Sequence, residues 1–205
     1  VDSILSYTAS HSVTGFSGSP YYYSNTPTYS YTQTTQKDVT VNSSTTTTHT
    51  VTTGASNINN VLNTSTFSGK TQFLFTAAEL SGGSLSAGDI HGLNLDVNSS
   101  ASEANFLRIR LLHTARTVLD PTDVDISGFT EVYYSNTNFA TGANYLQFYA
   151  PFNWDGTSNV IVELSYTNST ASSNTEFQGG NTGSNSTLIA GGNNYAEFTG
   201  GEDLQ

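Results

Sequence analysis

The stretch PFNWDGTSNVIVELSY, residues 151–166, predicts the fold of this 205-residue chain. In its second half, Val160, Val162, Leu164 and Tyr166 share one face, and Glu163 and Ser165 lie opposite. A period of two is typical of a half-buried antiparallel strand. In its first half, Asp155 and Gly156 predict a tight turn in which glycine takes a positive φ.

The same alternation recurs on the N-terminal side of this stretch. The segments are KTQFLFT at 70–76, HGLNLDVN at 91–98, NFLRIRLLHT at 105–114, TEVYYSN at 130–136 and NYLQFYAPF at 144–152. Several short strands at close spacing predict an all-β fold, an antiparallel β-sandwich that is jelly-roll-like. In residues 105–114 the apolar positions alternate with Arg108 and Arg110, so we expect both guanidinium groups to face solvent. Thr76 and Glu79, in TAAEL, form a capping box that predicts one helical turn.

Residues 1–55 differ in composition from residues 56–205. They are rich in Thr, Ser and Tyr, as in PYYYSNTPTYSYTQ, and contain few large aliphatic side chains. Thr, Tyr and Val favour strands, but so few aliphatics cannot build a separate core. We therefore expect an N-terminal β-arm over 1–55 that packs on the β-sandwich domain of 56–205 or on a neighbouring copy.

The charge and the hydropathy of the chain each argue against one class of partner. The net charge is −11, with five basic residues in all. Nucleic-acid binding needs clustered cations, so no nucleic-acid partner is expected. No apolar run approaches the roughly 20 residues that span a bilayer, so no membrane insertion is expected.

The residue types that are missing bear on location. The chain has no Cys, which excludes a disulfide framework and a thiolate metal site. It has no Met and begins with Val1, so we expect a processed product or an excised fragment. Removal of an export signal is the simplest explanation, trimming being the alternative, and it predicts an extracellular or cell-surface location.

Aromatic residues are the candidates for ligand binding. Trp154 either closes one end of the sandwich together with Phe152 or forms a stacking platform for sugar rings, and its size favours the first interpretation. Tyr21, Tyr22 and Tyr23 are better platform candidates. The alternative for these tyrosines, which we favour, is cross-strand pairing that holds the arm down.

Acidic residues gather in LDPTDVDISG, residues 119–128. Asp120, Asp123 and Asp125 are either solvated turn acids, the favoured interpretation, or ligands of a weakly bound calcium ion. No other cofactor is expected. The four histidines have no metal-binding spacing, and neither a G-x-S-x-G elbow nor a phosphate-binding loop is present, so we expect no enzymatic activity.

Three blocks in order carry a resemblance to a known module. Residues 76–80, 87–97 and 142–163 resemble a recurrent extracellular β-sandwich module of large secreted or surface proteins of Bacteroidota, often exported by the type IX secretion system. The likeness covers residues 57–170, and residues 1–50 depart from it. It implies secretion and a non-catalytic adhesive, structural or accessory role, and it supplies no catalytic residues.

These observations lead to one expected function and its rivals. We expect a secreted, non-enzymatic, cell-surface structural or adhesive protein that self-assembles as a filament subunit through its N-terminal arm, with other copies of itself as partners. The alternative is a carbohydrate-binding accessory module of a secreted enzyme, with polysaccharide or surface glycans as partners. An ice-binding surface on the Thr run at 45–48 is a third hypothesis.

Overall fold

The computed structural model describes residues 4–9, 35–40, 46–51, 56–58, 61–62, 64–99, 103–180 and 184–192. The chain divides into two compact units, Val1–Thr47 and Thr48–Gln205. In the first unit, β1 (Ile4–Ala9) and β2 (Thr35–Thr40) form a two-stranded antiparallel sheet in continuous register.

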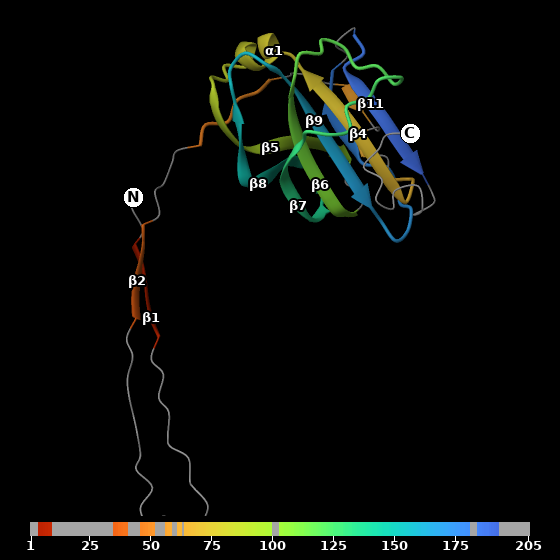
Figure 1. The fold of residues 1–205 in the computed structure, drawn as a ribbon. Coiled ribbons are helices and arrows are strands. Elements are labelled where there is room, and N and C mark those ends of the chain that lie inside the picture. The colour runs from red at the N-terminus through yellow and green to blue at the C-terminus, as the bar shows by residue number, and fades with distance from the viewer. Residues whose placement is uncertain are drawn as a thin grey trace, which may run out of the picture. The chain divides into compact units, whose positions relative to one another are not determined.

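The second unit is a sandwich of two antiparallel sheets (Figure 1), which confirms the predicted all-β class. The four-stranded sheet has the order β3–β10–β5–β8, formed by Ser56–Ile58, Glu176–Gly179, Gly88–Ser99 and Gly142–Trp154. The five-stranded sheet has the order β11–β4–β9–β6–β7, formed by Thr187–Gly192, Ser68–Phe75, Asn159–Thr167, Glu103–Thr114 and Thr130–Asn138.

The connections between strands alternate between the two sheets. From β4 to β11, every pair of consecutive strands lies in different sheets, except for the hairpin of β6 and β7. Alternation of this kind is what a jelly-roll-like topology requires. The helix α1 (Ala77–Gly82) lies on the connection from β4 to β5, and Thr76 and Glu79 form its capping box as predicted.

The main core lies between the sheets. The alternating apolar residues of β6 and β9 face inward, as their spacing predicts, and are buried: Leu107, Ile109, Leu111, Val160, Val162, Leu164 and Tyr166. Residues from outside the predicted strands complete this core. Among them are Leu62 and Phe139, whose ring meets that of Phe177 edge-on at 5.4 Å between centroids.

The outer face of the five-stranded sheet is covered as well. Leu119 packs there against Leu74 and Ile161, and Phe129 and Leu188 join the same small cluster. The loop of residues 115–129 supplies Leu119 and Phe129. As a result β4 and β9 are buried on both faces, although alternation predicts half-buried strands.

Burial under this loop overturns the expectation that Arg110 faces solvent. Only 8% of the residue is exposed, and its Nε and Nη2 atoms donate to Glu163 Oε1 at 2.9 and 2.6 Å. Gln72 Nε2 donates to Glu163 Oε2 at 2.9 Å and to the carbonyl of Asp125 at 2.8 Å. The loop carbonyl is therefore part of a buried polar network. Arg108 remains partly exposed.

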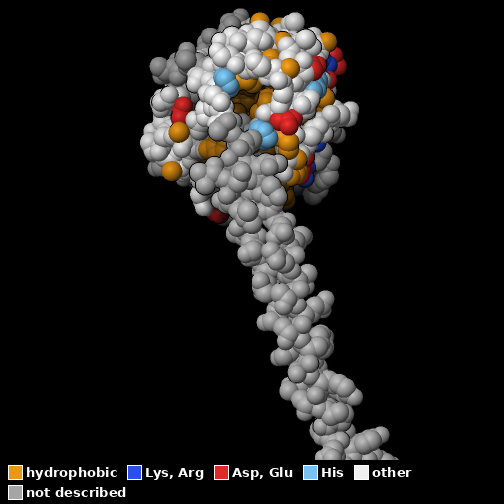
Figure 2. Space-filling model, turned by 90° about the vertical axis from the view of Figure 1, so that its left-hand side faces the viewer, with side chains coloured by type: hydrophobic (Ala, Val, Ile, Leu, Met, Phe, Trp, Pro, Cys, Tyr) orange, Lys and Arg blue, Asp and Glu red, His pale blue; other side chains and the backbone are white. Residues whose placement is uncertain are grey.

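Uncharged groups dominate the visible surface. In Figure 2 white atoms predominate, hydrophobic side chains line a hollow, and Lys or Arg side chains are sparse. This view agrees with the composition, in which 10% of residues are charged. In the part of the chain that the structure describes, no helix has the length and apolar character needed to cross a bilayer.

Candidate functional sites

Trp154 is a core residue in this structure. Only 1% of it is exposed, and its indole Nε1 donates to the carbonyl of Ser158 at 2.8 Å. The turn that follows has Gly156 at φ +80°, as Asp155 and Gly156 predict. A sugar ring cannot stack on a buried indole, so the assignment of Trp154 to ligand binding is corrected: it closes the sandwich with Phe152, which is also buried.

Two of the aspartates in residues 119–128 form ion pairs with an arginine of the same loop. Arg116 Nε donates to Asp125 Oδ2 at 2.6 Å, and its Nη2 lies 2.9 Å from Asp123 Oδ2. The hydrogen bond to Asp125 raises the pKa of Arg116, and the bond to Asp123 raises it further. Asp120 instead accepts from the amide and hydroxyl of Thr122, and these bonds lower its pKa.

This arrangement favours turn acids over calcium ligands for Asp120, Asp123 and Asp125. Two of the three carboxylates converge on Arg116, and the third closes a local turn. Among the described residues, no group of three His, Cys, Asp or Glu side chains could hold a metal ion. The remaining candidates, Tyr21, Tyr22 and Tyr23, lie outside the described residues.

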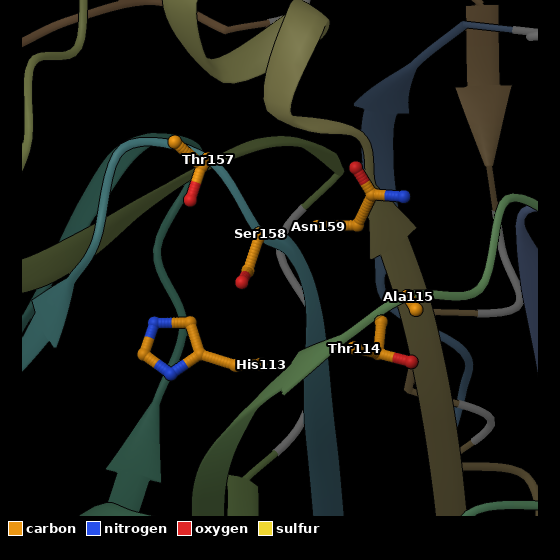
Figure 3. A pocket seen from close by; sticks show the side chains of 6 residues that line it. All are labelled: His113, Thr114, Ala115, Thr157, Ser158 and Asn159. Atoms are coloured by element: carbon orange, nitrogen blue, oxygen red, sulfur yellow. The ribbon is translucent and has the colours of Figure 1, made fainter.

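A shallow depression of about 420 Å³ lies where the end of β6 meets the turn before β9 (Figure 3). It is lined by His113, Thr114, Ala115, Thr157, Ser158 and Asn159. His113 and Ser158 point into the same space, while the Asn159 amide points away from it. That amide accepts from Ala77 N at 2.7 Å and donates to the carbonyl of Arg116 at 2.6 Å, so Asn159 holds neighbouring segments together.

The polar groups of this depression are arranged to stabilise a turn. Asp155 accepts from Ser158 Oγ at 2.6 Å, from Ser158 N at 2.7 Å and from Thr157 N at 2.8 Å. These bonds hold the pKa of Asp155 far below its usual range. A nucleophilic serine needs a good general base as its acceptor, whereas this carboxylate is a weak one. The rings of His113 and Phe152 are in contact, with 4.6 Å between their centroids and 37° between their planes.

A β-bulge in β6 builds a different kind of site. Ala104 pairs with Thr137 and Leu107 pairs with Ser135, so Asn105 and Phe106 share a single opposite residue. Phe106 takes φ +53°, a left-handed conformation that is an outlier for a bulky residue. Amide oxygens of Asn136 and Asn168 accept from the bulged N–H groups of Phe106 and Asn105, each at 2.8 Å.

The bulge leaves the Phe106 ring on the surface beside Tyr134. The two residues are 55% and 51% exposed, and their ring centroids are 6.4 Å apart with 30° between the ring planes. Arg108 lies over the Tyr134 ring with its Cζ 5.6 Å from the centroid. Its Nε is 3.0 Å from Glu131 Oε2.

Tyr149 of β8 joins this group from the other sheet. Its hydroxyl donates to Glu131 Oε1 at 2.8 Å. Desolvation raises the pKa of Tyr149, and the hydrogen bond to Glu131 raises it further. A continuous set of contacts therefore runs from Phe106 through Tyr134, Arg108 and Glu131 to Tyr149. We call these five residues the aromatic surface.

Sequence reasoning did not identify the aromatic surface, although one signal for it is present. Phe106 and Arg108 are two residues apart in the segment 105–114, so alternation alone assigns Phe106 to the face opposite Leu107. The neighbouring strand that supplies Tyr134 and Glu131 is set by long-range pairing, which spacing within one segment does not reveal.

The comparisons with known proteins leave the geometry as the main source of functional argument. No protein-family model, no curated protein and no solved structure matches this chain.

Proposed function

We propose that this chain is a secreted, non-enzymatic structural or adhesive protein of the cell surface that self-associates by strand addition through its N-terminal arm. The observation that carries this proposal is the edge strand β11. Its six residues contain no charged residue and no proline, and it pairs with β4 in continuous register from Thr187 to Gly192.

The other edges of the sandwich carry features that discourage pairing, and β11 does not. β3 has three residues, and β7 and β8 are each interrupted by register shifts. Short edges, bulges and charges are the usual devices that block strand addition. A regular, uncharged edge is the natural acceptor for an added strand.

The first unit is a suitable donor. β1 and β2 form a sheet of two strands, and among the described residues no third strand extends it. An isolated two-stranded sheet is marginally stable in water, so pairing with a further strand stabilises it. We infer that the arm of one copy adds to the β11 edge of the next.

Sedimentation velocity of the full chain tests the proposal with a matched pair of variants. Ile189→Lys places a charge on the β11 edge, and Ile126→Lys places the same charge on the loop of residues 115–129. The two isoleucines are 45% and 46% exposed, so both variants should fold. We expect concentration-dependent association of the wild type and of Ile126→Lys, and its loss in Ile189→Lys.

Negative-stain microscopy of the same samples shows what forms. Fibres from the wild type support a filament subunit. Deletion of residues 1–47, the first compact unit, should leave a folded monomeric sandwich. Association that survives both the deletion and Ile189→Lys would contradict strand addition through the arm.

The aromatic surface favours a second candidate function, a carbohydrate-binding accessory module of a secreted enzyme. Paired exposed rings beside hydrogen-bonding groups are suited to ligands that have both apolar faces and hydroxyl groups. The two candidates use different parts of the chain, the β11 edge and the β6–β7 hairpin, and so can be tested separately.

A further inference from the structure

We propose that the aromatic surface is a binding site for neutral polysaccharide, with sugar rings stacked on Phe106 and Tyr134 and sugar hydroxyls bonded to the Arg108–Glu131 pair. This inference deepens the second candidate function by naming its site and ligand class. It does not depend on self-association.

Both rings are presented to solvent. Phe106 and Tyr134 are each more than half exposed, and their ring centroids are 6.4 Å apart with the planes tilted by 30°. Arg108 lies over the Tyr134 ring, so a sugar would stack on the exposed part of that ring. A pyranose has an apolar face of C–H groups that packs on such a ring, and neighbouring sugars of a chain can use neighbouring rings. Contiguous exposed aromatic side chains are typical of ligand-binding or interaction surfaces.

The backbone at Phe106 is held in an unusual conformation. A phenylalanine at φ +53° is strained, and the bulge that imposes it is stabilised by the amides of Asn136 and Asn168. Strain of this kind concentrates at ligand-binding positions, where the surrounding structure fixes it. Here the bulge leaves an aromatic ring on the surface, next to a second one.

Polar groups lie beside the two rings. Arg108 and Glu131 are partly exposed and paired at 3.0 Å, and Tyr149 fixes the Glu131 carboxylate from the other side. All five residues lie on strands, which hold a site more rigidly than loops do. A guanidinium group and a carboxylate together can donate to and accept from the hydroxyls of a sugar.

The charges at this site and over the whole chain favour a neutral ligand. Arg108 and Glu131 cancel each other locally, and the whole chain carries a net charge of −11. A polyanion would therefore be repelled. A protein partner is disfavoured because a stable interface buries about 800 Å² on each side around an apolar centre, whereas here an ion pair adjoins the two rings.

Affinity electrophoresis of the full chain in gels containing cellulose derivative, laminarin, mannan or starch tests the proposal, with alginate as the polyanionic probe. We expect retardation by at least one neutral polymer and none by alginate. Phe106→Gly and Tyr134→Ala should each weaken binding about tenfold, the loss expected when one well-buried ring contact is removed. Phe106→Gly also relieves the positive φ, so it keeps the fold while removing the ring.

Tyr145→Ala is the matched control. Tyr145 is 55% exposed, but its ring lies over Gly92 and its hydroxyl donates to the carbonyl of His91 at 3.5 Å, and it is not one of the five residues of the aromatic surface. It should leave retardation unchanged, and so should Ile189→Lys, which separates this site from self-association.

Three outcomes would overturn the proposal. The first is the absence of retardation by all four neutral polymers. The second is an equal loss of retardation in Tyr145→Ala. The third is self-association of the wild type that Phe106→Gly abolishes, which would assign the aromatic surface to a second copy of the chain.

Discussion

The left-handed conformation of Phe106 predicts which of two variants that lack the ring, Phe106→Gly and Phe106→Ala, is the more stable. At an ordinary strand position, a protein with glycine is less stable than the same protein with alanine by about 0.5–1 kcal/mol, because glycine makes the unfolded chain more flexible. At a left-handed position, a residue with a Cβ loses about 1–2 kcal/mol. Phe106 has φ +53°, so Phe106→Gly should be more stable than Phe106→Ala by about 0.5–1 kcal/mol.

Urea unfolding of both variants measures this difference. Neither variant retains the contact with the Tyr134 ring, so that contact cancels in the comparison. With a slope of about 2 kcal/mol per M, the midpoint of Phe106→Gly should lie roughly 0.3–0.5 M above that of Phe106→Ala. The slopes of the two variants should agree.

The same pair of substitutions at Tyr134 is the control. Tyr134 is similarly exposed on the adjacent strand, opposite Arg108, and it is not among the described residues with positive φ. There, alanine should be the more stable variant. If alanine is also the more stable at position 106, the left-handed conformation of Phe106 does not exist in solution.

Four further predictions concern the core, the buried network and the first unit. Trp154→Ala should lower the free energy of unfolding by about 3–5 kcal/mol, as large aromatic truncations in cores do; a melting temperature close to the wild-type value would contradict its burial. Arg110→Met should cost about 3–5 kcal/mol, because it leaves the buried Glu163 carboxylate without an opposite charge, and adding Glu163→Leu should recover most of that loss in chemical denaturation. Asp155 has a folded-state pKa below its unfolded value, so its contribution to stability is present above about pH 4 and disappears as the pH falls toward the folded-state pKa. The melting temperatures of wild type and Asp155→Asn should therefore differ at neutral pH and converge only in strong acid. A difference that widens on acidification would refute the lowered pKa of Asp155. In timed trypsin digestion of the dilute, unassociated chain followed by mass spectrometry, the first cut should come after Lys37, because β2 then belongs to a sheet of only two strands. A first cut after Arg110 would show that the loop over it opens more readily than the arm.

Local features of the sequence predict the features of the fold that depend on near neighbours. The alternation of Val160, Val162 and Leu164 correctly assigns the inner face of β9, and Thr76 with Glu79 correctly marks the start of α1. Asp155 and Gly156 predict their own turn. Each of these signals acts within a few residues, so one segment contains all the information.

Features that depend on distant segments could not be predicted in this way. Alternation places Arg110 on the outer face correctly, but it cannot show that residues 115–129 cover that face and bring Asp125 within reach of Gln72. The left-handed Phe106 likewise depends on Asn136 and Asn168, which are 30 and 63 residues away from their bonded partners in the chain. The aromatic surface is therefore visible only once β6 and β7 are paired.

The loop of residues 115–129 should be less tolerant of insertions than most connections between strands. Surface loops usually accept extra residues, because few of their atoms are fixed by the rest of the protein. This loop is fixed to the rest of the protein at several points, by Leu119 in the outer cluster, by the Arg116 carbonyl that accepts from Asn159, and by the Asp125 carbonyl on Gln72. Lengthening it between Leu119 and Asp125 would displace the cover of the Arg110–Glu163 pair and admit water to charges that the sheet now shields. Among variants of this chain, we expect length changes to collect elsewhere, and this outer loop to vary as conservatively as a core strand.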